Sequence, residues 1–276
     1  GQLDLGTGVP AMTGILLATT PKVAQRFGAG QLDEIGPLVR QALWLALAVG
    51  SVAGVLLWNA EFALRLMKVD EDLIEPAMGY LHGVAFGFPC VALYHVLRCY
   101  SDGMGRTRPS MVIGLLGLLL NIPLNYVLIY GKLGIPPLGS VGCGWATAGV
   151  MAFMLLAMIV WVRRASAYRQ TTPLRRFEPP RWAPIKRLLG IGMPIGISVF
   201  AEASIFSVIA LLIGSLGATV VAGHQIALNF ASLVFMIPYS IGMAATVRIG
   251  QALGRGAPRD ARFAAGVSMV TALAYA

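Results

Sequence analysis

One carboxylate, Glu202, stands alone in a long apolar stretch and is the residue that most directly suggests chemistry. It is the single charged residue between Leu188 and Val247. An acid at the centre of a lipid bilayer costs at least about 2.5 kcal/mol, and such acids commonly bind a cation or carry a proton. Glu202 is therefore a candidate Na⁺ ligand or proton carrier. The alternative is a protonated carboxyl that makes a structural hydrogen bond between helices.

A second group of polar side chains lies in equally apolar surroundings. Asn121 and Asn125 are four residues apart, so a helix places both amides on one face, and Pro123 between them frees a backbone carbonyl. These oxygens suit a cation or an oriented water, while hydrogen bonding between helices is an equally good explanation. Thr147, which follows the glycine-containing stretch Gly142–Ala146 (GCGWA), has the same two interpretations, and packing is favoured there.

Signatures of catalysis are absent from the sequence. It contains no GxxxxGK[ST], HExxH or GxSxG motif. The histidines and cysteines are scattered, with neither a CxxC pair nor a zinc-ligand spacing: His82, His95, His224, Cys90, Cys99 and Cys143. We expect no enzymatic activity, no cofactor and no metal other than a coupling Na⁺ at Glu202.

The overall composition is that of a membrane protein. Of the 276 residues, 57% are hydrophobic and 12% are charged, whereas soluble domains have about 25% charged residues. The mean hydropathy is +0.74. The 33 glycines and 16 prolines are typical of membrane helices. We predict an all-α polytopic membrane protein.

Apolar windows of about 20 residues, the length needed to cross a bilayer, locate the spans. Seven spans and the start of an eighth are predicted: Leu5–Pro21, Gln41–Ala60, Ala77–Leu97, Pro109–Gly131, Leu133–Val162, two in Leu188–Val247 divided by the turn Gly214–Gly217, and Phe263–Ala276. Pro194 and Pro238 fall inside spans. They are candidate hinges, or else simple kinks.

The basic residues gather on one side of these spans. Eighteen of the 21 Lys and Arg residues fall there, while the other side has only Arg65, Lys68 and Lys132 beside five acidic residues. The positive-inside rule places the eighteen in the cytoplasm. The net charge of +9 therefore reports membrane topology, and a nucleic-acid partner is excluded.

An internal repeat relates the first basic turn to the last. Val23–Gly30 reads VAQRFGAG, and Ile249–Gly256 reads IGQALGRG at a constant offset of 226. Six spans separate the copies, and an even number indicates a parallel repeat, with two halves related by an axis along the membrane normal. We expect two six-helix lobes related by a pseudo-two-fold axis.

The same offset predicts how the chain divides. We expect residues 1–163 to form the N-terminal lobe without its first span, residues 164–186 a basic cytoplasmic connection, and residues 187–276 the start of a C-terminal lobe. Both lobes are expected to be incomplete, because the counterpart of the span near Arg187 would lie before residue 1. About four more spans would follow Ala276.

Several motifs resemble the multidrug and toxic compound extrusion (MATE) family, and within it the bacterial NorM branch. They are Pro21–Gly30 (PKVAQRFGAG), Leu119–Tyr126 (LLNIPLNY), Val141–Ala148 (VGCGWATA) and Ala222–Phe230 (AGHQIALNF). The resemblance covers the family's second span to the start of its ninth.

The resemblance implies a twelve-helix, two-lobed antiporter of the inner membrane that exports cationic amphiphilic compounds against Na⁺ or H⁺ influx. Glu202 matches the seventh-span glutamate that is a cation ligand in that branch. Asn121, Asn125 and Thr147 match positions that line the polar cavity of the N-terminal lobe. Some relatives have an aspartate where this chain has Asn125. We expect a monomer when the protein is full length.

Three alternatives to such an antiporter have their own expected sequence features. A lipid-linked oligosaccharide flippase of the same superfold would have basic residues lining its cavity, and none lies within these windows. An intramembrane enzyme would show clustered acids or histidines at one depth. A membrane fragment that transports nothing would leave the buried carboxylate of Glu202 unexplained.

Overall fold

The structure is a computed structural model that describes residues 12–61, 65, 71–132, 136–174, 177–214 and 218–275. Within these ranges the chain is helical, with no strand. A helical segment over residues 12–17 precedes the following elements: α2 (Thr19–Gly28), α3 (Leu32–Trp58), α5 (Glu71–Gly103), α6 (Arg108–Tyr130), α7 (Gly139–Arg164), the 3₁₀ turn η1 (Ser166–Tyr168), α8 (Trp182–Gly214), α9 (Ala218–Gly254) and α10 (Pro258–Tyr275).

Six of these helices are long and apolar enough to cross a membrane. They are α3 and α5 to α9, and each contains most or all of one predicted window, so the prediction of an all-α polytopic protein is confirmed. The start of the first predicted span, and residues 215–217 of the turn expected between α8 and α9, lie outside the described residues.

The helices extend further at their basic ends than the apolar windows do. Helix α3 begins at Leu32, nine residues before the predicted window, and α8 begins at Trp182. Arg40, expected in a loop, therefore lies inside α3, where it is only 8% exposed. Polar residues can extend a helix in this way because a tertiary partner satisfies them, as described below.

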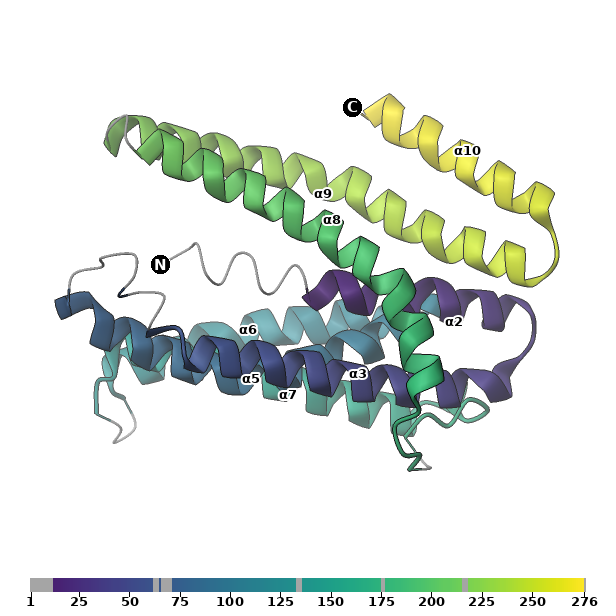
Figure 1. Cartoon of the computed structure of the whole chain (residues 1–276), viewed down its shortest axis with the longest axis horizontal. Helices are drawn as coiled ribbons and strands as arrows, with labels where there is room; N and C mark the ends of the chain where they lie inside the picture. The colour runs from purple at the N-terminus through teal and green to yellow at the C-terminus, as the bar shows by residue number, and fades with distance from the viewer. Residues whose placement is uncertain are drawn as a thin grey trace.

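The first helices form a bundle, and the later ones diverge from it (Figure 1). Helices α3, α5, α6 and α7 pack side by side. Helix α5 packs against both α3 and α7, and α6 packs mainly against α7. Helices α8 and α9 lie along each other and contact the bundle at one end only. We call this the basic end, because it holds the turns around residues 30, 105 and 256 and the connection before α8.

The two copies of the sequence repeat face each other at the basic end, where α2 packs on α9. A Cβ added to Gly28 would overlap the carbonyl oxygen of Gln251, and one added to Gly254 would overlap the carbonyl oxygen of Gln25. The offset of 226 maps each of these pairs onto the other. A Cβ on Gly250 would lie 2.8 Å from that of its own counterpart, Ala24. The contact is thus reciprocal, as a two-fold relation requires.

The two helix ends also share one hydrogen-bond pattern. Gly30 and Gly256 adopt left-handed φ values of 73° and 71°, which glycine reaches without the strain that a Cβ causes. The amides of Ala29 and Arg255 donate to the carbonyls four residues earlier, Gln25 and Gln251. These equivalent caps confirm the parallel repeat.

This contact predicts the effect of Gly254→Ala. The added methyl group has to displace the α2 backbone, so we expect a loss of about 1–3 kcal/mol of stability, measured as a lower melting temperature of the purified protein. Gly223→Ala is the control on the same helix, because nothing lies within 4 Å of an added Cβ there. It should leave the melting temperature unchanged or raise it. Equal melting temperatures for the two variants would refute the close contact.

Candidate ion and substrate site

The two asparagines of α6 are in contact, as their spacing predicts. Nδ2 of Asn125 donates to Oδ1 of Asn121 at 2.9 Å and to the Asn121 carbonyl oxygen at 3.0 Å. Oδ1 of Asn125 is buried and has no hydrogen-bond partner among the residues that the structure describes. One amide oxygen therefore remains available as an acceptor for a cation, a water or a substrate hydrogen.

Thr147 lies on the neighbouring helix α7 and makes a local contact. Its hydroxyl donates to the carbonyl of Cys143, one turn earlier, at 2.9 Å. A threonine bonded in this way satisfies its own polar group. This contact agrees with packing as the favoured interpretation. No hydrogen bond between Thr147 and the two asparagines occurs in the described part of the chain.

Glu202 lies near the middle of α8, and its side chain is exposed. Among the described residues it has no ion pair and no hydrogen bond, and no direct contact with Asn121 or Asn125 is found. The predicted site residues therefore form two separate groups, one on α6 and α7 and the other on α8.

Each of the candidate hinges lies inside a helix, Pro194 in α8 and Pro238 in α9. A proline removes one backbone hydrogen bond and bends a helix, and α8 does change direction along its length (Figure 1). The Ser198 hydroxyl donates to the Pro194 carbonyl at 3.0 Å. Pro194 precedes Glu202 by eight residues on the same helix.

Glycines hold α8 against the helical segment 12–17. A Cβ on Gly192 would overlap the Ile15 carbonyl oxygen, and one on Gly14 would lie 2.7 Å from the Gly196 Cα. Gly192 and Gly196 form the small-xxx-small spacing that permits close backbone approach in membranes. Sequence analysis missed this crossing, although the spacing was a readable signal for it. The crossing fixes the part of α8 that leads to Glu202.

A cavity of about 740 Å³ lies between α5, α6 and α9 near the basic end. Its lining includes Asp102, which is held by the Ser110 hydroxyl at 2.9 Å and by Arg98 at 3.5 Å. Gln251 of α9 donates to the Gly103 carbonyl at 3.2 Å and so joins the repeat contact to the end of α5. Sequence analysis did not identify this acid, although Arg98 and Asp102 have the i, i+4 spacing of an ion pair.

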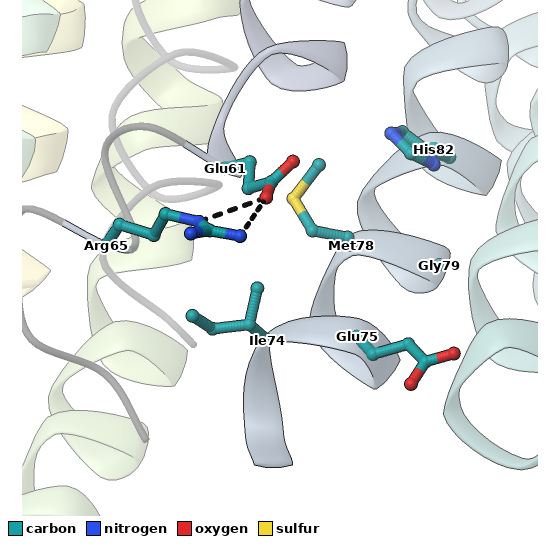
Figure 2. A pocket seen from close by; sticks show the side chains of 7 residues that line it. All are labelled: Glu61, Arg65, Ile74, Glu75, Met78, Gly79 and His82. Atoms are coloured by element: carbon teal, nitrogen blue, oxygen red, sulfur yellow. Dashed lines mark hydrogen bonds and ion pairs between the residues drawn. The ribbon is translucent and has the colours of Figure 1, made fainter. Parts of the chain in front are cut away.

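A second cavity, of about 540 Å³, lies at the opposite end (Figure 2). Arg65 pairs there with Glu61 at 2.8 Å, while Glu75 points away from this pair. His82 stacks on Trp58 at 4.1 Å, and its Nε2 lies 3.3 Å from the Trp58 carbonyl oxygen. Within the described ranges, no three His, Cys, Asp or Glu side chains form a group that could hold a metal.

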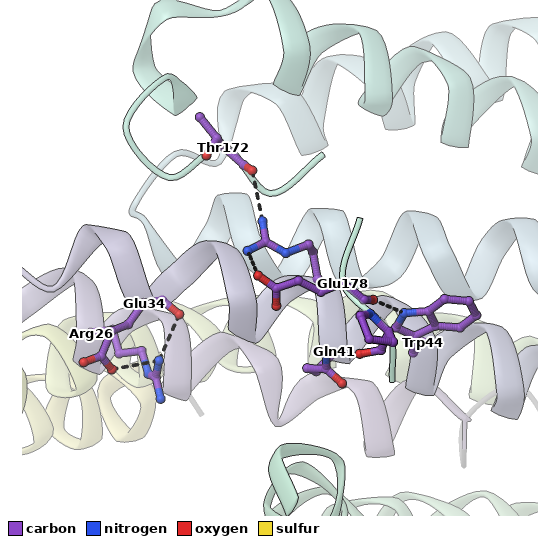
Figure 3. Close-up of polar contacts among 8 residues, drawn as sticks. Arg26, Glu34, Gln41, Trp44, Thr172 and Glu178 are labelled. Atoms are coloured by element: carbon purple, nitrogen blue, oxygen red, sulfur yellow. Dashed lines mark hydrogen bonds and ion pairs between the residues drawn. The ribbon is translucent and has the colours of Figure 1, made fainter. Parts of the chain in front are cut away.

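The connection before α8 is attached to the first bundle by polar contacts that are mostly partly buried (Figure 3). Arg40 of α3 pairs with Glu178 at 2.5 Å and donates to the Thr172 carbonyl at 3.2 Å. Trp44 Nε1 donates to the Glu178 carbonyl at 2.9 Å, and Gln41 bonds the backbone on both sides of Pro180. Tyr100 and Thr171 share a further buried hydrogen bond. The predicted cytoplasmic connection is therefore attached to α3 and α5 by specific hydrogen bonds.

Comparison with known proteins identifies the family. A family model described as MatE matches residues 2–127 and 194–276. The chain belongs to the MatE family. Multidrug resistance protein PmpM of Pseudomonas aeruginosa is 65% identical over 266 residues, which are 96% of this chain and 56% of PmpM. Multidrug resistance protein MdtK of Yersinia pestis is 46% identical over 264 residues, or 95% of this chain and 58% of MdtK.

Solved structures of MatE proteins have the same fold. The MATE transporter NorM-NG, in complex with R6G and a monobody, is 34% identical with a TM-score of 0.80, over 98% of this chain and 61% of that one. The eukaryotic MATE transporter AtDTX14 shares the fold at 21% identity, with a TM-score of 0.84. The match covers 96% of this chain and 58% of the AtDTX14 chain. This chain thus spans little more than half the length of these MatE relatives.

The attachment of the connection predicts the effect of Glu178→Ala. The change leaves the Arg40 charge buried without its partner, at a cost of about 2 kcal/mol for a partly exposed pair. We expect faster cleavage by trypsin at Arg169 or Arg181, which are both exposed, in time courses of limited proteolysis. Glu61→Ala breaks the exposed pair with Arg65 and is the matched control, with no expected change. A wild-type rate for Glu178→Ala would contradict the attachment.

Proposed function

We propose that the protein is a multidrug efflux antiporter that exports cationic amphiphilic compounds in exchange for Na⁺ or H⁺. The observation that carries this proposal is the similarity to two multidrug resistance proteins, joined to a single carboxylate in the apolar stretch Leu188–Val247. A lone acid at this depth needs a cation or a proton to be stable.

In this proposal, Glu202 binds the coupling cation, and Asn121, Asn125 and Thr147 line a polar cavity in the N-terminal lobe. The unpartnered Oδ1 of Asn125 supports a polar role for that surface. Cation binding at Glu202 and drug binding favour opposite-facing states of the two lobes. The contact of α2 with α9 at the basic end is what such a movement has to break.

The lobes are proposed to be residues 1–163 and 187–276, with residues 164–186 between them. Pro194 and Pro238 are the proposed points of bending. The attachment of Thr171, Thr172, Glu178 and Arg181 to α3 and α5 supports a pivot immediately after it, where α8 begins. We further propose a monomer of the inner membrane, with the basic end in the cytoplasm.

The test is efflux of ethidium, a fluorescent lipophilic cation, from cells that express the complete gene. Glu202→Gln keeps the size and removes the charge, so coupled efflux should fall by about tenfold or more, while Glu61→Gln, outside the apolar stretch, should have no effect. Vesicles with an imposed Na⁺ or proton gradient then identify the coupling ion. Unchanged coupled efflux in Glu202→Gln would show that the site assignment is wrong.

A further inference from the structure

A cavity of about 490 Å³ at the basic end lies outside the proposed transport site. It is bounded by the turn between α5 and α6 and by the end of α7 with η1. Its lining includes two arginines of the turn, Arg106 and Arg108, and two aromatic residues, Trp161 and Tyr168. Neither the coupling site nor the drug cavity uses these residues.

The positive charge of this cavity is not balanced in the described part of the chain. Arg106 and Arg108 are exposed and have no carboxylate within ion-pair distance there. Asp102, the nearest acid along the sequence, is already engaged by Ser110 and Arg98. Burial raises the pKa of Tyr168, so its phenol adds no negative charge at neutral pH. Two guanidinium groups therefore face the cavity without a counter-charge.

Packing restricts where the Arg106 guanidinium group can lie. The Arg106 guanidinium lies over the Tyr168 ring, 6.0 Å from its centroid, at the range of a cation–π contact. The Arg106 amide donates to the Ser101 carbonyl at 2.9 Å, and the hydroxyls of Ser101 and Tyr168 are 3.1 Å apart. Arg108 is the first residue of α6. One of the two guanidinium groups, that of Arg106, is thus held beside the cavity by an aromatic contact.

Exposed apolar surface continues from the cavity toward the middle of the helices. Leu119 follows Arg108 by eleven residues, which is the same face of α6, and is 55% exposed. On α7, Val160 and Leu156 are 47% and 62% exposed. Trp161 beside them is 38% exposed, and tryptophan is enriched where membrane meets water. Charged groups beside apolar helix faces and a tryptophan are the composition expected at the headgroup level of a bilayer.

We propose that this cavity binds the phosphate group of an anionic phospholipid, whose acyl chains lie along the exposed faces of α6 and α7. The planar guanidinium group matches phosphate oxygens with paired hydrogen bonds. Basic pockets between membrane helices suit anionic headgroups for this reason. Soluble phosphate has the same headgroup chemistry but gains nothing from the apolar faces. The site does not depend on the transport proposal.

The test is lipid binding by the purified product of the complete gene, measured by native mass spectrometry. Phosphatidylglycerol should bind in preference to phosphatidylcholine with the same acyl chains. The double variant Arg106→Gln/Arg108→Gln should weaken phosphatidylglycerol binding about tenfold and leave phosphatidylcholine unchanged. Arg255→Gln/Arg259→Gln removes the same charge from another turn at the basic end. This matched control should bind like the wild type.

Three results would overturn the proposal. Wild-type affinity for phosphatidylglycerol in the first double variant would show that these arginines form no lipid site. An equal loss of affinity in both double variants would show that the effect comes from the net positive charge of the basic end and not from a specific site. Displacement of phosphatidylglycerol by millimolar inorganic phosphate would assign the cavity to a soluble anion. If the double variant does not fold, Arg108→Gln alone, which removes no described contact, should still weaken phosphatidylglycerol binding measurably.

Discussion

The backbone contact between α2 and α9 is the constraint on which the arrangement of the two halves depends. Gly28 and Gly254 each lie against a carbonyl oxygen of the opposite helix, so neither position has room for a side chain. Because the contact is reciprocal, one short motif supplies both of its surfaces. The two halves approach closely at the basic end, and α8 and α9 diverge from the bundle toward the other end (Figure 1). Gln251 extends this contact to the end of α5.

Local sequence patterns predicted the spans and the repeat because both depend on properties of neighbouring residues. Apolar windows located six helices, and the constant offset identified the two motifs that meet at the basic end. The spacing of Asn121 and Asn125 predicted their contact. Helix boundaries were less predictable, as Arg40 shows, because its partner Glu178 is 138 residues away. No local pattern reports a partner at that separation.

The candidate site was predictable as a set of residue types and less so as an arrangement. Glu202 was visible as one charge in a stretch of apolar residues, and the structure places it on α8 away from the two asparagines. The role of each of these residues stays a prediction. Counting basic residues predicted a membrane orientation but treated all of these residues alike. The structure separates Arg40 and Arg98, which have acidic partners, from Arg106 and Arg108, which have none among the described residues.

The attachment of the connection to α3 and α5 has a consequence for how the protein can be divided into separately expressed halves. A cut placed at the end of α7 would remove Thr171 and Glu178 from the half whose buried groups they satisfy. Tyr100 and Arg40 would then lose their partners even if every helix of that half were retained. The natural unit therefore includes the connection, and a split belongs between Arg181 and Trp182, directly after the anchoring bond from the Arg181 amide to Gln41.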